Sequence, residues 1–196
     1  MQTPEAKHLK LVNRVDRLTI DNQDVPSLHR HAQYNKLMNS FVLRILFHSL
    51  DSVCVCKVTL QVFVTKGTAM CFTCNFSVEQ FHHLFSLLKV KYGLTIKQCS
   101  MCTSVWSYSH WGKIGNLAAF YNFMYKECTL YPVFYHPELF ACVTILLKSH
   151  HCTVRVFHTG NVVLLGIRSS KQVESVVHVL NGLMTDFVLI KEVFLM

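Results

Sequence analysis

The chain has 196 residues, of which 51% are hydrophobic and only 15% are charged, and its mean hydropathy is +0.30. This composition is too apolar for a disordered segment, and the length suits one domain or two half-domains that share a core. Nineteen Lys and Arg against eleven Asp and Glu give a formal net charge of +8, which favours a polyanionic partner such as nucleic acid.

The first half of the chain predicts strands followed by a long amphipathic helix. An apolar run at residues 41–45 and a strand-like segment at residues 60–67, which ends in a tight turn, are typical of antiparallel strands. The helix is predicted to begin at the capping box Ser77-Val78-Glu79-Gln80, to carry apolar residues at helical spacing and to end at Gly93. A strand and a short helix are expected before these elements.

The second half repeats this order. An apolar run at residues 143–147 and a strand with a tight turn at residues 154–160 precede a helix that begins at a second capping box, Ser169-Ser170-Lys171-Gln172. The helix is expected to extend to Phe187. Each half is therefore predicted to form a strand, a short helix, four strands and a long helix.

Two such halves predict an α+β fold with one antiparallel sheet, both long helices on one face and the other face open to a partner. We place the first repeat at residues 9–93 and the second at residues 94–187, within a single intertwined domain. Residues 188–196 form an apolar C-terminal tail, for which we expect either an extra strand or a partner-docking segment.

The cysteines and the enzyme motifs argue against metal and catalytic sites. No secretory or membrane-spanning segment is expected, and nine cysteines, an odd number, then indicate reduced thiols. The pairs Cys71/Cys74 and Cys99/Cys102 have nearly the spacing of a zinc ribbon, but both lie in strand-like segments, where residues three apart point to opposite faces. No P-loop, G-x-S-x-G or H-E-x-x-H motif is present, so we expect no metal, no cofactor and no catalysis.

Two motifs in the second half resemble the TATA-binding protein (TBP) family. The first motif is Tyr135-x-Pro137-Glu138-Leu139-Phe140, and the second is Phe157-x-x-Gly160-x-Val162-Val163-Leu164-x-Gly166. The interval between the two motifs matches the family without an insertion or a deletion. The first half is similar through Ala32-x-Tyr34-Asn35, Arg44-Ile45, Phe63, Gly67 and the capping box at residues 77–80. The resemblance covers residues 10–187 and implies a two-repeat saddle, with a curved sheet in a DNA minor groove and helices on the convex face.

The resemblance also implies which side chains kink the DNA. Phe140 and Phe157 fall on the wedge positions of the second repeat, and Phe63 falls on one wedge position of the first. Met38 takes the remaining wedge position if a one-residue gap follows Asn35, and methionine is among the side chains that unstack base steps.

Base and phosphate contacts differ from the family pattern. Two Asn and two Thr contact base edges in the family, and here these positions hold Lys10, Gln98, Thr73 or Phe72, and Leu165. Gln98 can donate to an A·T acceptor, whereas Leu165, like the nearby Val163, contributes only apolar contact with the groove. Strict preference for a TATA sequence is therefore not expected.

Further contacts follow from the same resemblance. Arg44 and Arg168 fall on basic positions of the family, and Lys57, Lys148 and Arg155 add sequence-independent contacts to phosphates. Glu138, with Leu139 beside it, falls where the family binds transcription factor IIB. The loop at residues 46–57 is longer than its counterpart, and we interpret it as an extended stirrup that flanks the wedges and contacts a partner.

The sequence thus predicts a TBP-like initiation factor that acts in the nucleus, or in the host nucleus or cytoplasm if the protein is viral. Its expected partners are A·T-rich duplex promoter DNA and proteins such as transcription factor IIB, with self-association when DNA is absent and no binding to membranes. The alternative is a TBP-like fold that has lost specific DNA binding and uses its open sheet for a protein partner. Cellular or viral origin stays open.

Overall fold

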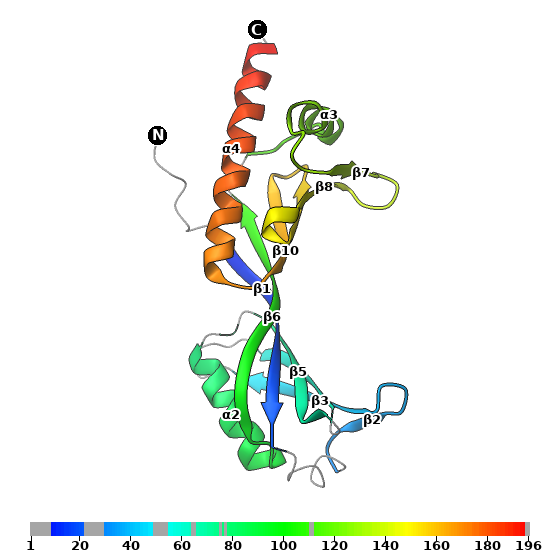
Figure 1. Cartoon of the computed structure of the whole chain (residues 1–196), viewed down its shortest axis with the longest axis vertical. Coiled ribbons are helices and arrows are strands. Elements are labelled where there is room, and N and C mark those ends of the chain that lie inside the picture. Colours follow the sequence, from blue (N-terminus) through cyan, green and yellow to red (C-terminus); the bar gives the residue numbers. More distant parts are fainter. Residues whose placement is uncertain are drawn as a thin grey trace. The chain divides into compact units, whose positions relative to one another are not determined.

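The computed structural model describes residues 9–21, 30–48, 55–63, 66–74, 76, 78–109 and 112–194. The chain divides into two compact units (Figure 1), which we call the N-terminal unit, Leu11–Ser104, and the C-terminal unit, Val105–Met196 with Met1–Lys10. Hydrogen bonds connect ten strands in the order β2-β3-β4-β5-β1-β6-β10-β9-β8-β7. No helix within the described residues has the length and apolar character that crossing a bilayer requires.

The described elements alternate strands with three α-helices. In chain order they are β1 (Leu9–Ile20), β2 (Gln33–Asn35), β3 (Ser40–His48), β4 (Val55–Phe63), β5 (Thr68–Thr73), α2 (Val78–Tyr92), β6 (Ile96–Ser109), α3 (Leu117–Glu127), β7 (Val133–Tyr135), β8 (Cys142–Leu147), the 3-10 turn η4 (Lys148–His150), β9 (Cys152–Phe157), β10 (Asn161–Ile167) and α4 (Ser170–Phe194).

In the N-terminal unit, α2 covers one face of the strands (Figure 1). Alternate residues of β3, β4 and β5 are buried on this face, as the period-2 pattern of a half-covered strand requires, among them Leu43, Leu60 and Cys71. The helix contributes Phe81 and Leu88, as the sequence predicts, and also Leu84 and Tyr92. The opposite face carries no helix among the described residues of this unit.

The C-terminal unit has the same plan, with α3 and α4 against one face of β8, β9 and β10 (Figure 1). The predicted apolar stripe of the second long helix is buried there, from Val173 through Leu180 to Phe187. A polar contact also joins helix and sheet, because the hydroxyl of Tyr108 on β6 donates to Oδ1 of Asn181 at 3.2 Å.

The predicted helix boundaries are mostly confirmed. Helix α2 ends directly before Gly93, whose φ of 67° suits glycine, and Ser77 lies outside the described residues. At the start of α4, Oγ of Ser169 accepts from the amide of Gln172 at 3.2 Å, as the capping box predicts. The predicted short helix of the second half is α3, whereas its counterpart in the first half falls on residues 22–29, which are not described.

Two expectations about local structure are corrected in part. Helix α4 continues to Phe194, so the described part of the tail is helical and not an extra strand, and the docking alternative stays a prediction; no glycine or proline follows Phe187 to stop the helix. The described ends of the longer segment at residues 46–57 belong to two strands, because β3 and β4 pair as far as His48 and Val55, and residues 49–54 lie outside the described residues. His48 and Val55 lie at the end of the hairpin away from Phe63, so these described parts do not flank the wedge candidates.

Candidate nucleic-acid interface

The strand faces that the helices leave uncovered carry hydroxyl, apolar and basic side chains. In the N-terminal unit, cross-strand pairing places residues of one face in rows. One row is Val15, Phe72, Thr59 and Arg44, and the next is Arg17, Met70, Gln61 and Val42. We call this face the open face of its unit.

The C-terminal unit has an equivalent open face. One of its rows is Phe134, Thr144, Arg155 and Val163, and another is Leu146, Thr153 and Leu165. The predicted groove contacts Val163 and Leu165 therefore lie on this face, and both are half-buried.

The charged side chains of the open faces are basic. Asp16 is the only Asp or Glu within the ten described strands, and it is buried on the helix side of β1. Its carboxylate is held by the Arg14 guanidinium, with an Nη2 to Oδ1 distance of 2.7 Å. Since Arg17, Arg44 and Arg155 lie on the open faces, both faces suit a polyanionic ligand.

The wedge candidates of the C-terminal unit are close to the open face. Phe140 lies in the turn between β7 and β8, is 58% exposed, and donates its amide to the carbonyl of His136 at 2.9 Å. Phe157 ends β9 opposite Cys142 and is half-buried. The guanidinium of Arg155 lies 4.9 Å from the centre of the Phe140 ring. The cationic side chain of Arg155 therefore contacts the exposed ring of Phe140.

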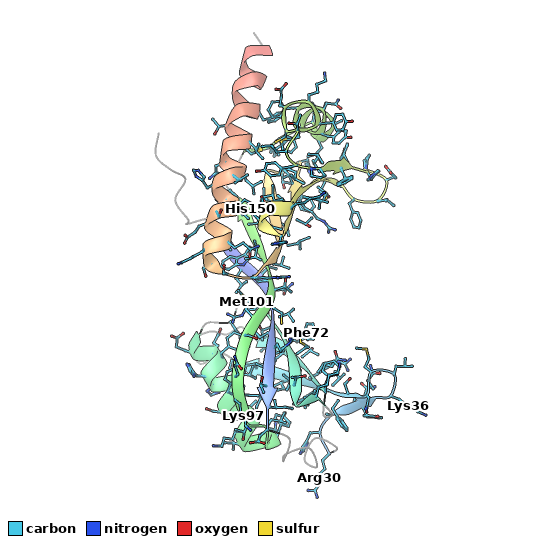
Figure 2. All side chains as sticks on the ribbon, in the orientation of Figure 1. Arg30, Lys36, Phe72, Lys97, Met101 and His150 are labelled. Atoms are coloured by element: carbon cyan, nitrogen blue, oxygen red, sulfur yellow. The ribbon has the colours of Figure 1, made fainter. Side chains whose placement is uncertain are left out.

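The N-terminal unit places its candidates at matching points. Met38 lies in the turn between β2 and β3 and is 52% exposed, and its amide donates to Oδ1 of Asn35 at 3.3 Å. Lys36 lies in the same turn (Figure 2). Phe63 ends β4 as Phe157 ends β9, and Nζ of Lys66 lies 5.7 Å from its ring centre.

The two residues proposed for one central position lie on different faces of β5. Phe72 is 41% exposed and lies on the open face (Figure 2), whereas Thr73 is 4% exposed on the helix side. Lys10 is exposed on β1, next to Leu9, which packs against the core of the C-terminal unit. Gln98 is exposed on β6.

The predicted phosphate and partner residues are exposed, except for Arg155, which is half-buried. Arg44 donates to Oε1 of Gln33 at 3.4 Å, and Arg168 lies between β10 and α4. Glu138 contacts His136, with an Oε1 to Nδ1 distance of 3.4 Å, and Leu139 beside it is 68% exposed. Glu138 and Leu139 share the turn that carries Phe140.

The cysteines with zinc-ribbon spacing lie on β5 and β6 or directly after β5. Cys71 is buried on β5, and burial, reinforced by the Asp16 carboxylate, raises the pKa of its thiol to about 12. Cys99 is exposed on β6, and the pKa of its thiol is raised to about 11, mainly by desolvation. Within the described residues, no three His, Cys, Asp or Glu side chains group as metal ligands do.

Two residues that lie near the wedge candidates were not predicted from the sequence to contribute to the wedge turns. Leu37, 99% exposed, stands beside Met38 just as Leu139 stands beside Phe140. The feature of the sequence that could have identified Leu37 is that it forms, with Met38, a pair of apolar residues in an otherwise polar turn. Arg155 was expected only to neutralise phosphate, and its contact with Phe140 depends on a turn geometry that the sequence pattern does not contain.

The chain is similar to known proteins in part of its sequence and in its fold. Residues 122–187 match the family model described as "Transcription factor TFIID (or TATA-binding protein, TBP)". The solved structure of Methanococcus jannaschii TBP matches with a TM-score of 0.68 and 19% sequence identity, over 91% of this chain and 99% of that chain. No curated protein matches the sequence.

These findings confirm the predicted fold class, a large antiparallel sheet with helices in an α+β arrangement. At 19% identity the structural match establishes the fold, and the family model adds sequence evidence for residues 122–187. The chain is therefore similar to TBP in the sequence of residues 122–187 and in its overall fold.

Proposed function

We propose that this protein is a transcription initiation factor that binds the DNA minor groove through its open sheet faces and kinks the duplex with exposed side chains. The observation that carries the proposal is the repeated placement of wedge candidates. Each unit presents an exposed apolar side chain, Met38 or Phe140, in the turn before the hairpin β3–β4 or β8–β9, and a half-buried phenylalanine, Phe63 or Phe157, at the end of that hairpin. Apolar wedges of this kind unstack base steps in minor-groove complexes.

The chemistry of the open faces supports the same ligand. Apolar side chains suit the sugar walls and base edges of a widened groove, and the lack of carboxylates avoids repulsion by phosphate. Arg44 and Arg168 are exposed and free to reach the DNA backbone by side-chain rotation. Phe72 and Leu165 replace polar readers, so we expect a preference for deformable A·T steps more than for one sequence.

The turn that carries Phe140 is the proposed contact for the transcription machinery. Glu138 and Leu139 are both exposed there, and we propose that they bind a protein similar to transcription factor IIB. A factor of this kind acts where the template is, in the nucleus or at another site of viral transcription.

Binding and bending of short duplexes test the proposal. Duplexes labelled at both ends, A·T-rich or G·C-rich, are titrated with protein over a salt series while energy transfer between the labels is recorded. We expect salt-sensitive binding with a sharp bend that favours A·T-rich DNA. Failure to bind either duplex, or binding without a bend, would contradict the proposal.

A second candidate function is a protein-interaction module built on the same fold. It is favoured by the apolar residues Phe72 and Leu165 at positions where the family reads bases, since an apolar sheet face can bind a protein or a second copy of the chain. Light scattering after size-exclusion chromatography distinguishes the two, because self-association in the absence of DNA is expected for this alternative. A strict monomer at high concentration that binds and bends DNA would exclude it.

A further inference from the structure

We propose that Arg155 reads the floor of the minor groove and is held in position for this by the ring of Phe140. This inference rests on the proposed DNA-binding function and assigns to the C-terminal unit a polar reader away from the central positions that the family resemblance implies. The chemistry it recognises is the pair of hydrogen-bond acceptors, adenine N3 and thymine O2, on an A·T minor-groove edge.

The first observation is that Arg155 lies in the interior of the open face. It belongs to β9, which is paired with β10 on one side and β8 on the other. Its cross-strand neighbours are Thr144 and Val163, a small hydroxyl and an apolar side chain. A sheet face that lies in a groove turns its interior side chains toward the base edges, whereas phosphates lie along its margins.

The second observation is that part of the guanidinium group has no acceptor among the described residues. The Nε atom of Arg155 is buried and has no hydrogen-bond partner in the part of the chain that the structure describes. Its charge is not paired with a carboxylate among these residues either: the nearest in sequence to its Phe140 contact, Glu138, contacts His136, and Asp16 contacts Arg14. A buried donor without an acceptor is costly, so a ligand whose acceptor reaches this atom after the side chain moves gains from this site.

The third observation is the contact with Phe140. The guanidinium carbon lies 4.9 Å from the centre of the ring, within the range of a cation–π interaction. This contact restricts an otherwise flexible side chain to the open face, beside the base step where Phe140 is proposed to wedge. Phe140 is thus a positioning residue for Arg155 in addition to its proposed role as a wedge.

The test separates base reading from simple phosphate contact. Affinities of the full chain and of Arg155→Leu are measured for A·T-rich and G·C-rich duplexes across a salt series, with melting curves to verify the fold. We expect Arg155→Leu to reduce the ratio of the two affinities on the order of tenfold, with little change in the salt dependence. The matched control is Arg44→Leu, which should weaken both duplexes equally and lower the salt slope by about one.

Arg155→Lys keeps a positive charge but loses the planar fork of donors, so it should also lose the A·T preference. This second variant keeps the inference testable if the leucine variant does not fold. A wild-type protein that binds and bends DNA while both variants retain its sequence preference would overturn the inference alone. Equal weakening of both duplexes with a reduced salt slope would show a phosphate contact instead. Failure of the wild-type protein to bind DNA would overturn the inference together with the proposed function.

Discussion

Replacing Phe140 by alanine should remove the kink at one end of the bound DNA and leave the free protein folded. A phenylalanine buries ~200 Å², so the 58% of Phe140 that is exposed offers ~120 Å², worth ~3 kcal/mol at ~25 cal/mol per Å² if base pairs cover it. Unstacking a base step costs about a few kcal/mol, and the variant avoids that cost as well as losing the contact. The bend should therefore decrease strongly, while the affinity falls by less than the ~150-fold that 3 kcal/mol represents.

Energy transfer between labels at the two ends of a duplex measures the bend, and a fluorescence titration measures the affinity. Leu139→Ala is the matched control, because Leu139 lies in the same turn and is 68% exposed. It should retain the bend and weaken binding of a factor similar to transcription factor IIB. An unchanged bend in Phe140→Ala, with the same melting temperature as the wild-type protein, would refute the wedge reasoning.

Three further predictions concern the stability of the fold. Arg14→Ala leaves the fully buried carboxylate of Asp16 without its cation and should lower the free energy of unfolding by ~3–5 kcal/mol in urea titrations. Gly166→Ala should cost ~2 kcal/mol or more in the same assay, because φ is +89° and the new Cβ would lie 2.9 Å from the backbone oxygen of His151. The pKa of the Cys71 thiol is raised from 9.0 to about 12 on folding, so its protonated form favours the native state; stability should be full below pH 9 and fall as the pH rises toward 12, and Cys71→Ala should flatten that decline.

The strands and helices were predictable because an element that buries one face has apolar residues at the period of that element. Alternation identified β4, β5 and β9, and the second capping box located the start of α4 through Ser169 and Gln172. The end of α4 was not identified, since a sequence without glycine or proline continues a helix as readily as it forms a strand. Apolar composition alone does not decide between the two structures.

The candidate site was predictable where a motif fixes the position along the chain, and less so where it depends on contacts across strands. The wedge candidates and Arg44 could be named from their place in the repeats. The choice between Phe72 and Thr73 required the register of β5 against β1 and β4, because a shift of one residue exchanges the two faces. The contact of Arg155 with Phe140 required the turn between β7 and β8 as well.

The two wedge turns carry different side chains, and this difference affects the orientation of the protein on a bound duplex. A factor with two identical ends would fit a symmetric duplex equally well in either direction. Here one turn presents Leu37 and Met38, and the other presents Leu139 and Phe140 next to a guanidinium. Under the proposed function, a flat aromatic ring and a flexible thioether favour different base steps, so the two orientations of the protein on a duplex should differ in free energy. The direction of transcription would then follow from which step lies at which end of the site.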